Sequence, residues 1–338
     1  MRKAIKRLLL AALLVMAAAG ALLGFLVAMP GDRSPQLLAN APEEARLQAQ
    51  LLRQVSAISG ERNYLKPERL EAAAQYIESE LRGMGYQIHR QAVPGRSGPV
   101  RNIEVRLEPA GTGDLGLVVI GAHYDSAEGT PAANDNGSGV AVLLELARAY
   151  QGRRAAPGFT GMRLVFYANE EPPYFETPQM GSWVHAADLK AQGLRVAAMY
   201  SLETMGAYYD APGTQKFPVP GLALLYPDRG NFIGFIGTTE SRALVRTAVG
   251  AFRETRRFPS EGIAAPGFVT GVDWSDHWSY AQHGYTGVMV TDTAPFRYPH
   301  YHTAQDTPDR INYAGLAKVT LGLREMLAKL YLQGGQGA

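Results

Sequence analysis

Apolar residues recur at helical spacing along the stretch that begins at Pro67 and ends at Met84. The positions concerned are Leu70, Ala73, Ala74, Ile77, Leu81 and Met84. This period predicts a helix with one buried face. Proline suits the first turn of a helix, and Gly83 and Gly85 supply a stop at its other end.

The period changes from helical to alternating after this stretch. Ile103, Val105 and Leu107 alternate with Glu104 and Arg106, which predicts a half-exposed strand. Uninterrupted short apolar runs then follow at residues 117–120, 164–168, 196–202 and 287–290. Runs of this kind are typical of strands buried on both faces of a parallel sheet.

Helical patterns separate these runs or follow them, at residues 140–150, 241–253 and 313–332. Alternating strands and helices predict an α/β fold with a largely parallel sheet. Residues 207–237 are rich in glycine, proline and aromatic residues. We expect them to form a long excursion over the sheet edge or the site, and the pattern assigns no helix or strand to them.

An uncharged apolar run extends from Leu8 to Met29 and follows four basic residues. At about 1.5 Å per residue, a helix of this length can cross the roughly 30 Å hydrocarbon layer. The basic flank favours a cytoplasmic N-terminus, so the rest of the chain would face outward. A cleaved signal peptide is the second interpretation, with Ala39-Asn40-Ala41 as the cleavage site, and a buried core helix is the third.

We therefore expect residues 1–30 to be a membrane anchor or signal segment. Residues 31–45, which are polar and contain proline, would form a tether, and residues 46–335 a single catalytic domain. The expected location is the cell membrane with the domain outside the cytoplasm, or the periplasm or exterior after signal cleavage. The membrane would then be a partner through the N-terminal helix.

Composition narrows the chemistry. The 338 residues include 33 basic and 31 acidic ones, and without the four N-terminal basic residues the balance becomes 29 to 31. A chain of this charge gives no indication of a nucleic-acid partner. The chain has no cysteine, which excludes disulfides, thiol catalysis and thiolate metal ligands. Any metal must therefore be held by histidine, aspartate and glutamate.

Metal-capable side chains follow every predicted buried strand. His123 and Asp125 follow the first run, Glu170-Glu171 the second, and Glu203 the third. Asp292 and then Tyr301-His302 follow the last run, and a turn containing Asp135 lies between the first two strands. Ligands of open α/β sheets gather at the carboxyl ends of the strands, so we expect these side chains to meet.

The donors suit zinc, because carboxylates and neutral imidazoles are its usual ligands when thiolates are absent. Five residues are the expected metal ligands: His123, Asp135, Glu171, Glu203 and His302. They can hold two divalent ions if one carboxylate bridges.

Three neighbouring residues are expected to support catalysis. Asp125 lies two residues after His123 on the same face of a strand, where it can fix the imidazole tautomer. Glu170 is free to take a proton from a water molecule activated by the metal. Tyr301 can donate its hydroxyl to a developing oxyanion.

These residues resemble the zinc aminopeptidase family M28. The resemblance extends from about residue 64 to residue 312. It is carried by His123-x-Asp125, Asn134-Asp135-Asn136-Gly137-Ser138-Gly139, Glu170-Glu171, Ser275-Asp276-His277 and Tyr301-His302-Thr303-x-x-Asp306-Thr307. It implies a three-layer αβα sandwich of the phosphorylase/hydrolase type.

The resemblance also implies how two zinc ions are shared. His123, Asp135 and Glu203 would hold one ion, and Asp135, Glu171 and His302 the other, with Asp135 bridging. Glu170 would be the general base and Tyr301 the oxyanion donor. The third strand-end ligand is usually aspartate in this family, whereas this chain has Glu203, which is still a competent ligand.

The sequence thus predicts a zinc-dependent aminopeptidase that removes N-terminal residues from peptides. One alternative is an acyltransferase of the glutaminyl-cyclase type, which shares the fold but uses one zinc ion. A carboxypeptidase or aminoacylase-type hydrolase is the second alternative, and a catalytically silent binding domain on the membrane is the third. The aromatic residues Tyr208, Tyr209, Phe217 and Phe232 are expected near the substrate's first residue.

Overall fold

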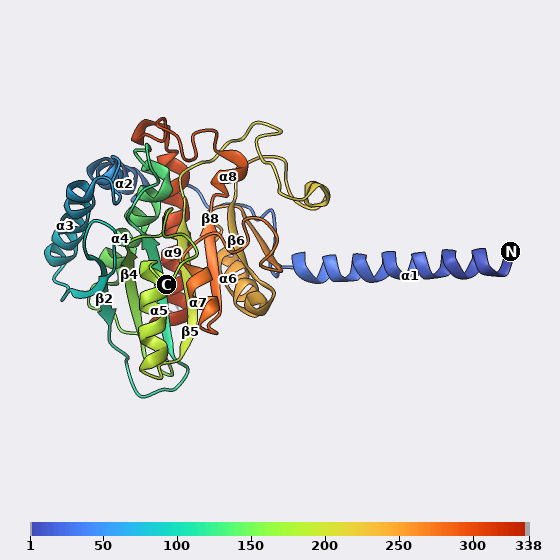
Figure 1. Cartoon of the computed structure of the whole chain (residues 1–338), viewed down its shortest axis with the longest axis horizontal. Helices are drawn as coiled ribbons and strands as arrows, with labels where there is room; N and C mark the ends of the chain where they lie inside the picture. Colours follow the sequence, from blue (N-terminus) through green and yellow to red (C-terminus); the bar gives the residue numbers. More distant parts are fainter. Residues whose placement is uncertain (1, 335–338) are drawn as a thin grey trace.

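Eight strands form one mixed sheet at the centre of the structure, a computed structural model that describes the chain from residue 2 to residue 334 (Figure 1). In chain order the strands are β1 (His89–Val93), β2 (Val100–Leu107), β3 (Leu117–His123), β4 (Gly161–Tyr167), β5 (Val196–Glu203), β6 (Ile233–Thr238), β7 (Ser260–Ala265) and β8 (Gly287–Thr291). Their order across the sheet is β1-β2-β4-β3-β5-β8-β6-β7. The central strands β4, β3, β5 and β8 run parallel to one another.

Nine helices surround or extend from this sheet in the described part of the chain. They are α1 (Arg2–Val27), α2 (Glu44–Ile58), α3 (Pro67–Gly83), α4 (Gly139–Tyr150), α5 (Gly181–Ala191), α6 (Arg242–Thr255), α7 (His277–Gln282), α8 (Ala294–Arg297) and α9 (Tyr313–Tyr331). Shorter π or 3₁₀ turns cover Ala133–Ser138, Pro220–Leu224, Thr239–Ser241 and Pro308–Arg310.

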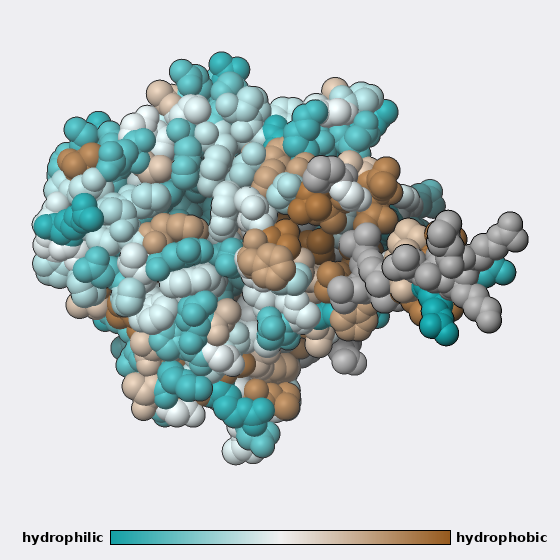
Figure 2. Space-filling model, turned by 45° about the vertical axis from the view of Figure 1, so that its right-hand side comes forward, coloured by the Kyte–Doolittle hydropathy of each residue, from teal (hydrophilic) through white to brown (hydrophobic). Residues whose placement is uncertain are grey.

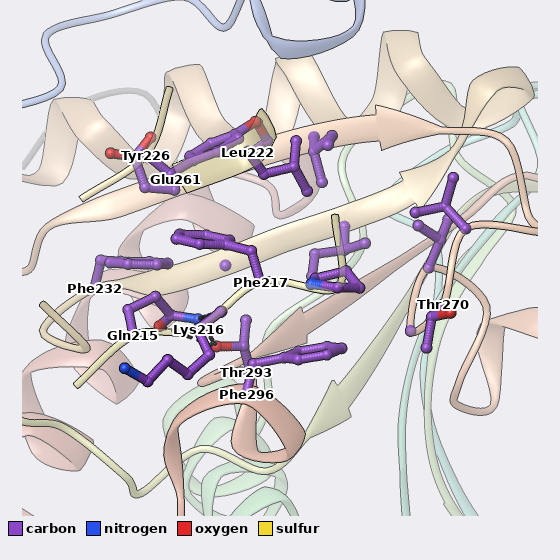
Figure 3. Close-up of a pocket in the computed structure, with 18 residues that line it drawn as sticks. Gln215, Lys216, Phe217, Leu222, Tyr226, Phe232, Glu261, Thr270, Thr293 and Phe296 are labelled. Carbon is purple, nitrogen blue, oxygen red and sulfur yellow. Dashed lines mark hydrogen bonds between the residues drawn. The ribbon is translucent and has the colours of Figure 1, made fainter. Parts of the chain in front are cut away.

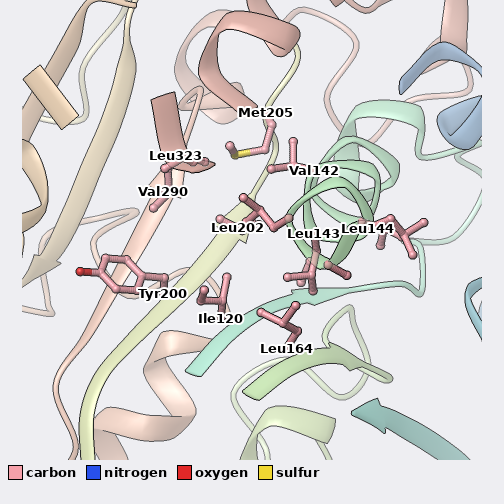
Figure 4. Packing of buried hydrophobic residues seen from close by; sticks show 14 of the residues in the cluster. Ile120, Val142, Leu143, Leu144, Leu164, Tyr200, Leu202, Met205, Val290 and Leu323 are labelled. Carbon is pink, nitrogen blue, oxygen red and sulfur yellow. The ribbon is translucent and has the colours of Figure 1, made fainter. Parts of the chain in front are cut away.

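Two apolar layers separate the helices from the sheet. The larger one joins one face of the sheet to α2, α3, α4, α6 and α9. Figure 4 shows part of it, with Val142, Leu143 and Leu144 of α4 beside Ile120, Leu164 and Leu202 of the central strands. The smaller layer packs α5 and α7 against the opposite face. The arrangement confirms the predicted three-layer αβα fold with a mostly parallel centre.

Most of the predicted elements are present. The helix expected at 67–84 is α3, with Pro67 in its first turn and Leu70, Ala73, Ile77 and Leu81 buried. The four buried apolar runs are β3, β4, β5 and β8. Each helical pattern is a helix, at α4, α6 and α9.

The structure adds an element to the unassigned segment and differs from one expectation. Residues 207–237 are not wholly irregular, because β6 begins at Ile233 and a 3₁₀ turn covers Pro220–Leu224. The strand predicted at 103–107 is present, but Glu104 is buried, with only 5% of its surface exposed. Its carboxylate lies 2.7 Å from His185 Nε2, and this neighbour across the layer explains why a charged residue is buried there.

The N-terminal helix α1 projects away from the sheet domain (blue in Figure 1). The C-terminal end of α1 and the chain just after it contact α6. Arg242 Nε donates to the Phe25 carbonyl at 2.9 Å, and Arg253 donates to the Pro30 carbonyl at 2.9 Å. Among the described residues, no helix has both the length and the apolarity needed to cross a membrane.

Candidate metal centre

The parallel strands bring their carboxyl ends to one edge of the sheet. His123 is the last residue of β3 and Glu203 the last residue of β5. Glu170 and Glu171 follow β4 after a two-residue link, and Asp292 directly follows β8. Parallel neighbours place these side chains on a common rim, where ligands of open sheets bind.

Asp135 reaches the same rim from the turn between β3 and α4. Asn134 fixes the turn to its neighbours. Its side chain donates to Asp292 Oδ2 at 2.9 Å and accepts from the Gly206 N–H at 2.8 Å. Gly139 lets the turn approach β5 closely, since a Cβ there would lie 2.7 Å from the Leu202 carbonyl oxygen. The turn can therefore hold Asp135 between the strand ends.

The two carboxylate oxygens of Asp135 face different histidines. Oδ1 lies 3.3 Å from His123 Nε2, which is also 3.3 Å from Glu203 Oε2. Oδ2 lies 2.9 Å from His302 Nε2. That imidazole nitrogen is in turn 3.4 Å from Glu171 Oε2. The five predicted ligands are thus brought together, with Asp135 at their centre.

Several polar atoms of this cluster are buried without a hydrogen-bond partner among the described residues. They are both ring nitrogens of His123, Asp135 Oδ1 and Glu171 Oε1. Buried polar atoms normally have partners, so their convergence on one space needs an explanation. His123, Asp135 and Glu171 offer ligand atoms within 4.8 Å of one another. The donor set of imidazole and carboxylate fits zinc.

Electrostatics also favour a bound cation. Burial, together with Asp135, raises the pKa of Glu203 to about 8, and burial also raises the pKa values of Glu170 and Glu171. Burial opposes the charge of His302, yet hydrogen bonds to Asp135 and Glu171 raise its pKa to about 11. The acidic groups therefore resist ionisation, while the neighbouring imidazole holds its proton. Both effects indicate an excess of buried negative charge, which a divalent cation would relieve.

Asp125 lies beside His123, as predicted, but its shortest hydrogen bonds go to the main chain. Its Oδ1 lies 3.5 Å from His123 Nδ1, which is long for a hydrogen bond. Instead, Oδ1 accepts from the Glu170 main-chain N–H at 3.0 Å, and Oδ2 accepts from the Glu171 N–H at 3.1 Å. Asp125 therefore positions the segment that carries the predicted base and one predicted ligand.

Glu170 and Tyr301 border the cluster as expected. Glu170 is buried, with 5% of its surface exposed, and its Oε2 lies 3.8 Å from His123 Nε2. The Tyr301 ring stacks on His302 with ring centroids 4.0 Å apart. Tyr301 and Glu203 line the same small cavity, which holds about 370 Å³ of empty space.

Left-handed backbone conformations concentrate around the rim. Asn169, Thr204 and Thr293 follow β4, β5 and β8, and have φ values of +59°, +47° and +60°. His302 itself has φ of +55°. Such conformations are costly for residues other than glycine and cluster at functional sites, where the surrounding structure enforces them.

Supporting residues were harder to find from the sequence. Ser275 Oγ donates to Glu203 Oε2 at 2.7 Å, and Asp306 accepts from the main-chain N–H groups of Asn134 and Asp135. Both residues belong to the motifs quoted above, but their partners are distant in sequence. His277 Nε2 lies 2.8 Å from the Val272 carbonyl oxygen, so this nitrogen is not free to bind a metal. Asp276 is buried and is not among the residues grouped as metal ligands.

Comparison with known proteins places this geometry in a family. A family model described as peptidase family M28 matches residues 102–327. An Escherichia coli protein named "Uncharacterized protein YfbL" is 42% identical over 268 residues, which cover 77% of this chain and 80% of that protein. A probable leucine aminopeptidase of Arthroderma otae is 29% identical over 231 residues, covering 64% of this chain but only 55% of that protein.

Solved structures share the fold. The LapA aminopeptidase of Legionella pneumophila has a TM-score of 0.64 at 17% identity, covering 88% of this chain and 77% of that one. A glutaminyl cyclase of Tannerella forsythia has a TM-score of 0.59 at 20% identity, covering 84% and 97%.

The family match confirms the predicted resemblance and, with it, a hydrolase of peptide bonds whose substrates are peptides. The predicted aminopeptidase class agrees with the family and with the leucine aminopeptidase relative. The predicted zinc dependence agrees with the family and with the group formed by His123, Asp135 and Glu171. On these grounds, and with the strand-end cluster in place, the chain belongs to peptidase family M28.

Proposed function

We propose that the chain is an aminopeptidase that uses two zinc ions to release N-terminal residues from peptides. The observation that carries this proposal is the position of Asp135, whose two oxygens face His123 and His302 separately. A bridging carboxylate between two histidine–carboxylate sets is the arrangement that two adjacent divalent ions require.

The proposed ligand sets follow the distances. His123, Asp135 and Glu203 hold one ion, and Asp135, Glu171 and His302 hold the other. When bound, zinc lowers the pKa of a water molecule towards neutrality and polarises the scissile carbonyl.

Glu170 transfers the proton in this proposal. Its carboxylate is buried at the rim and is held there by the contact between its main-chain N–H and Asp125. Burial raises its pKa, and this makes the carboxylate a better proton acceptor than an ordinary glutamate. Glu170 takes the proton of the attacking water and returns it to the leaving amine.

The remaining groups bind and orient the substrate. The excess of carboxylates attracts the charged α-amino group of a free N-terminus. Tyr301 directs its hydroxyl to the carbonyl oxygen as negative charge develops there. The cavity beside Glu203 and Tyr301 is lined by Ile236, Trp274, Met289 and Phe296, and we assign it to the side chain of the first residue.

The test uses the full chain loaded with zinc and two peptides of one sequence, one with a free and one with an acetylated N-terminus. Mass spectrometry should show stepwise loss from the free N-terminus alone, and a chelator should abolish it. Cyclisation of an N-terminal glutamine would instead support the glutaminyl-cyclase alternative. Shortening at the C-terminus, or removal of the acetyl group, would support a carboxypeptidase or an aminoacylase.

A variant separates the base from the metal site. Glu170→Gln should lower kcat by about 10²–10⁴-fold, the usual contribution of a general base, while the zinc content stays unchanged. Glu176→Gln is the matched control, because Glu176 lies on the same loop with an exposed side chain. Full activity in Glu170→Gln would refute the assignment of the base.

We also propose that the domain acts outside the cytoplasm. The support is the order of the N-terminal residues, in which Arg2, Lys3, Lys6 and Arg7 precede the uncharged run 8–29. Protease added to intact cells that express the chain, and to the same cells after permeabilisation, tests this. The proposal would be overturned if the domain stayed protected from the protease until the inner membrane was opened.

A further inference from the structure

A second cavity adjoins the one assigned to the substrate's first residue. We call the cavity at Glu203 and Tyr301 the site cavity and the second one the rear chamber. The rear chamber is larger than the site cavity, and both are partly open to solvent. The two share four wall residues, Ile236, Gly271, Thr293 and Phe296.

Apolar side chains form most of the rear chamber. Figure 3 shows the rings of Phe217 and Phe232 on one side of it and Phe296 with Thr293 on the other, with Leu222 and Tyr226 near the top. Ile263 of β7 and Val269 complete the apolar lining. An extended apolar group is therefore the ligand that fits the space.

Three polar side chains of the chamber wall are already paired. Glu261 forms an ion pair with Arg33 at 2.9 Å, and the Tyr226 hydroxyl donates to the Gly262 carbonyl at 2.8 Å. Gln215 accepts from Arg297 Nε at 2.7 Å. Lys216 also lines the chamber, with an exposed side chain. Among the three paired groups a charged ligand would find no free partner, and this favours an uncharged hydrocarbon beside them.

Phe296 contributes the only aromatic ring among the four shared wall residues. Its ring lies against the bare Cα of Gly271, where an added Cβ would lie 3.0 Å from the ring, and Phe296 is only partly buried. The main chain around it is fixed, because Lys216 N–H donates to the Phe296 carbonyl at 2.8 Å. The neighbouring Arg297 is buried and donates to the Phe232 carbonyl at 2.8 Å.

A side-chain rotation of Phe296 is therefore the simplest way to join the two cavities. Rotation between staggered positions needs no change of the main chain. Rotation would extend the site cavity towards Phe217 and Ile263 while the metal ligands stay in place.

We propose that the rear chamber receives the distal end of a long apolar side chain on the substrate's first residue, with Phe296 as the movable wall. This inference rests on the proposed aminopeptidase function and names its substrate class: peptides whose first residue carries an alkyl or aryl group longer than that of leucine. The surface near the chamber is correspondingly apolar. Leu224 and Phe268, which adjoin the chamber segments in sequence, are 88% and 89% exposed, and Figure 2 shows hydrophobic side chains gathered on this side of the molecule.

The test compares full-length, zinc-loaded protein on two peptides that differ only in the first residue, leucine or 2-aminodecanoic acid. The measured quantity is the ratio of kcat/KM for the long side chain to that for leucine. Ile263→Trp fills the rear chamber and should lower this ratio at least tenfold. Leu115→Trp is the matched control, because Leu115 lies outside both cavities with 49% of its surface exposed, and should leave the ratio unchanged.

A second variant and a binding measurement keep the test decisive. Phe296→Ala should raise the ratio of kcat/KM values. If Ile263→Trp does not fold, Val269→Trp replaces it as the variant that fills the rear chamber. Calorimetry with free 2-aminodecanoic acid, which has no amide bond to hydrolyse, tests the chamber without turnover, and Ile263→Trp should weaken this binding at least tenfold.

A ratio that is the same in wild type, Ile263→Trp and Phe296→Ala would overturn the proposal. Failure of the proposed function has a different signature, since neither peptide would then be cleaved. Calorimetry still decides the chamber in that case: equal binding by wild type and Ile263→Trp would refute it.

Discussion

Asp306 Oδ2 accepts a hydrogen bond of 3.1 Å from the main-chain N–H of Asp135. The other oxygen of Asp306 accepts from the Asn134 N–H at 2.9 Å and from the Tyr298 hydroxyl at 2.9 Å. Asp306 lies four residues after His302, so the loop that supplies one ligand also holds the turn that supplies the proposed bridge. The two parts of the metal centre are thereby positioned relative to each other.

Replacing Asp306 should weaken zinc binding without unfolding the protein. Asp306→Asn places an amide N–H where a carboxylate oxygen accepts, so one donor faces another. Zinc affinity should fall about 10–100-fold, the usual cost of removing a group that orients a ligand. Titration against a competing chelator measures this. Asp309→Asn, an exposed change on the same loop, is the control, and equal affinities in the two variants would contradict the role of Asp306.

Asp125 should matter for turnover through the main chain of Glu170 and Glu171. Asp125→Asn keeps the shape but can accept only one of the two N–H bonds, so the proposed base and its neighbour lose their fixed position. We expect kcat/KM to fall about 10–100-fold. Steady-state kinetics on an N-terminal leucine peptide measures it, with the exposed Asp114→Asn as control. Wild-type kinetics would show that the contact is dispensable.

Shortening Glu203 tests whether glutamate is required at this strand end. Glu203 lies 3.3 Å from His123 and accepts from Ser275 at 2.7 Å, so its full length is used. Glu203→Asp withdraws the carboxylate by about one bond length. We expect the bound zinc to fall from two ions per chain towards one at limiting zinc, as measured by elemental analysis after dialysis. If Glu203→Asp kept the same zinc content as the surface control Glu240→Asp, aspartate would serve equally well at this position.

Removal of zinc should lower thermal stability. A ligand that binds only the folded state at 1,000 times its Kd stabilises it by about 4 kcal/mol. Calorimetry with and without a chelator should therefore show a lower Tm in the metal-free sample and full recovery when zinc is returned. His302→Ala should show a smaller difference. The same Tm in both samples would contradict a buried metal centre.

Acid should weaken the packing of α3 through Glu78. Hydrogen bonding to Arg90, opposed by burial and helped by Arg101, lowers the pKa of Glu78 to about 2 from the ordinary 4.5. The folded-state pKa is depressed, so this stabilisation is complete above about pH 4.5 and disappears as the pH falls through about 2. Glu78→Gln should lower the free energy of unfolding by about 2 kcal/mol at pH 7.

Urea unfolding at several pH values measures this effect. The difference between wild type and Glu78→Gln should shrink between pH 4.5 and pH 2. Glu68→Gln, an exposed change on the same helix, should show no such trend. A difference that is the same at pH 3 and pH 7 would contradict the proposed linkage.

The sequence predicted the centre of the sheet better than its edges. The strands β3, β4, β5 and β8 are buried on both faces and are therefore continuous apolar runs. The strands at or next to the two edges differ. The β1 segment, His89–Val93, is mostly polar, and β6 and β7 contain glycine and form part of a turn-rich region. Their strand conformation depends on pairing with neighbours, which local composition does not record.

The metal cluster was predictable for a similar reason. The residues that hold its ligands in position were not. Each expected ligand follows a strand or a marked turn, so sheet topology alone brings the ligands together. The contacts of Ser275 with Glu203 and of Asn134 with Asp292 join segments 72 and 158 residues apart. No spacing rule within the sequence identifies such pairs before the fold is known.

The five residues of the cluster come from chain positions that extend from residue 123 to residue 302. Each ion would therefore connect parts of the chain that are separated by many residues. The loops between these parts are closed only when the chain folds, so the unfolded chain keeps the corresponding entropy. A chain that has just emerged from synthesis cannot offer this set of ligands until β8 and the loop after it are in place. Zinc capture would thus be among the last events of maturation, and a truncated product that ends before His302 would lack a complete site.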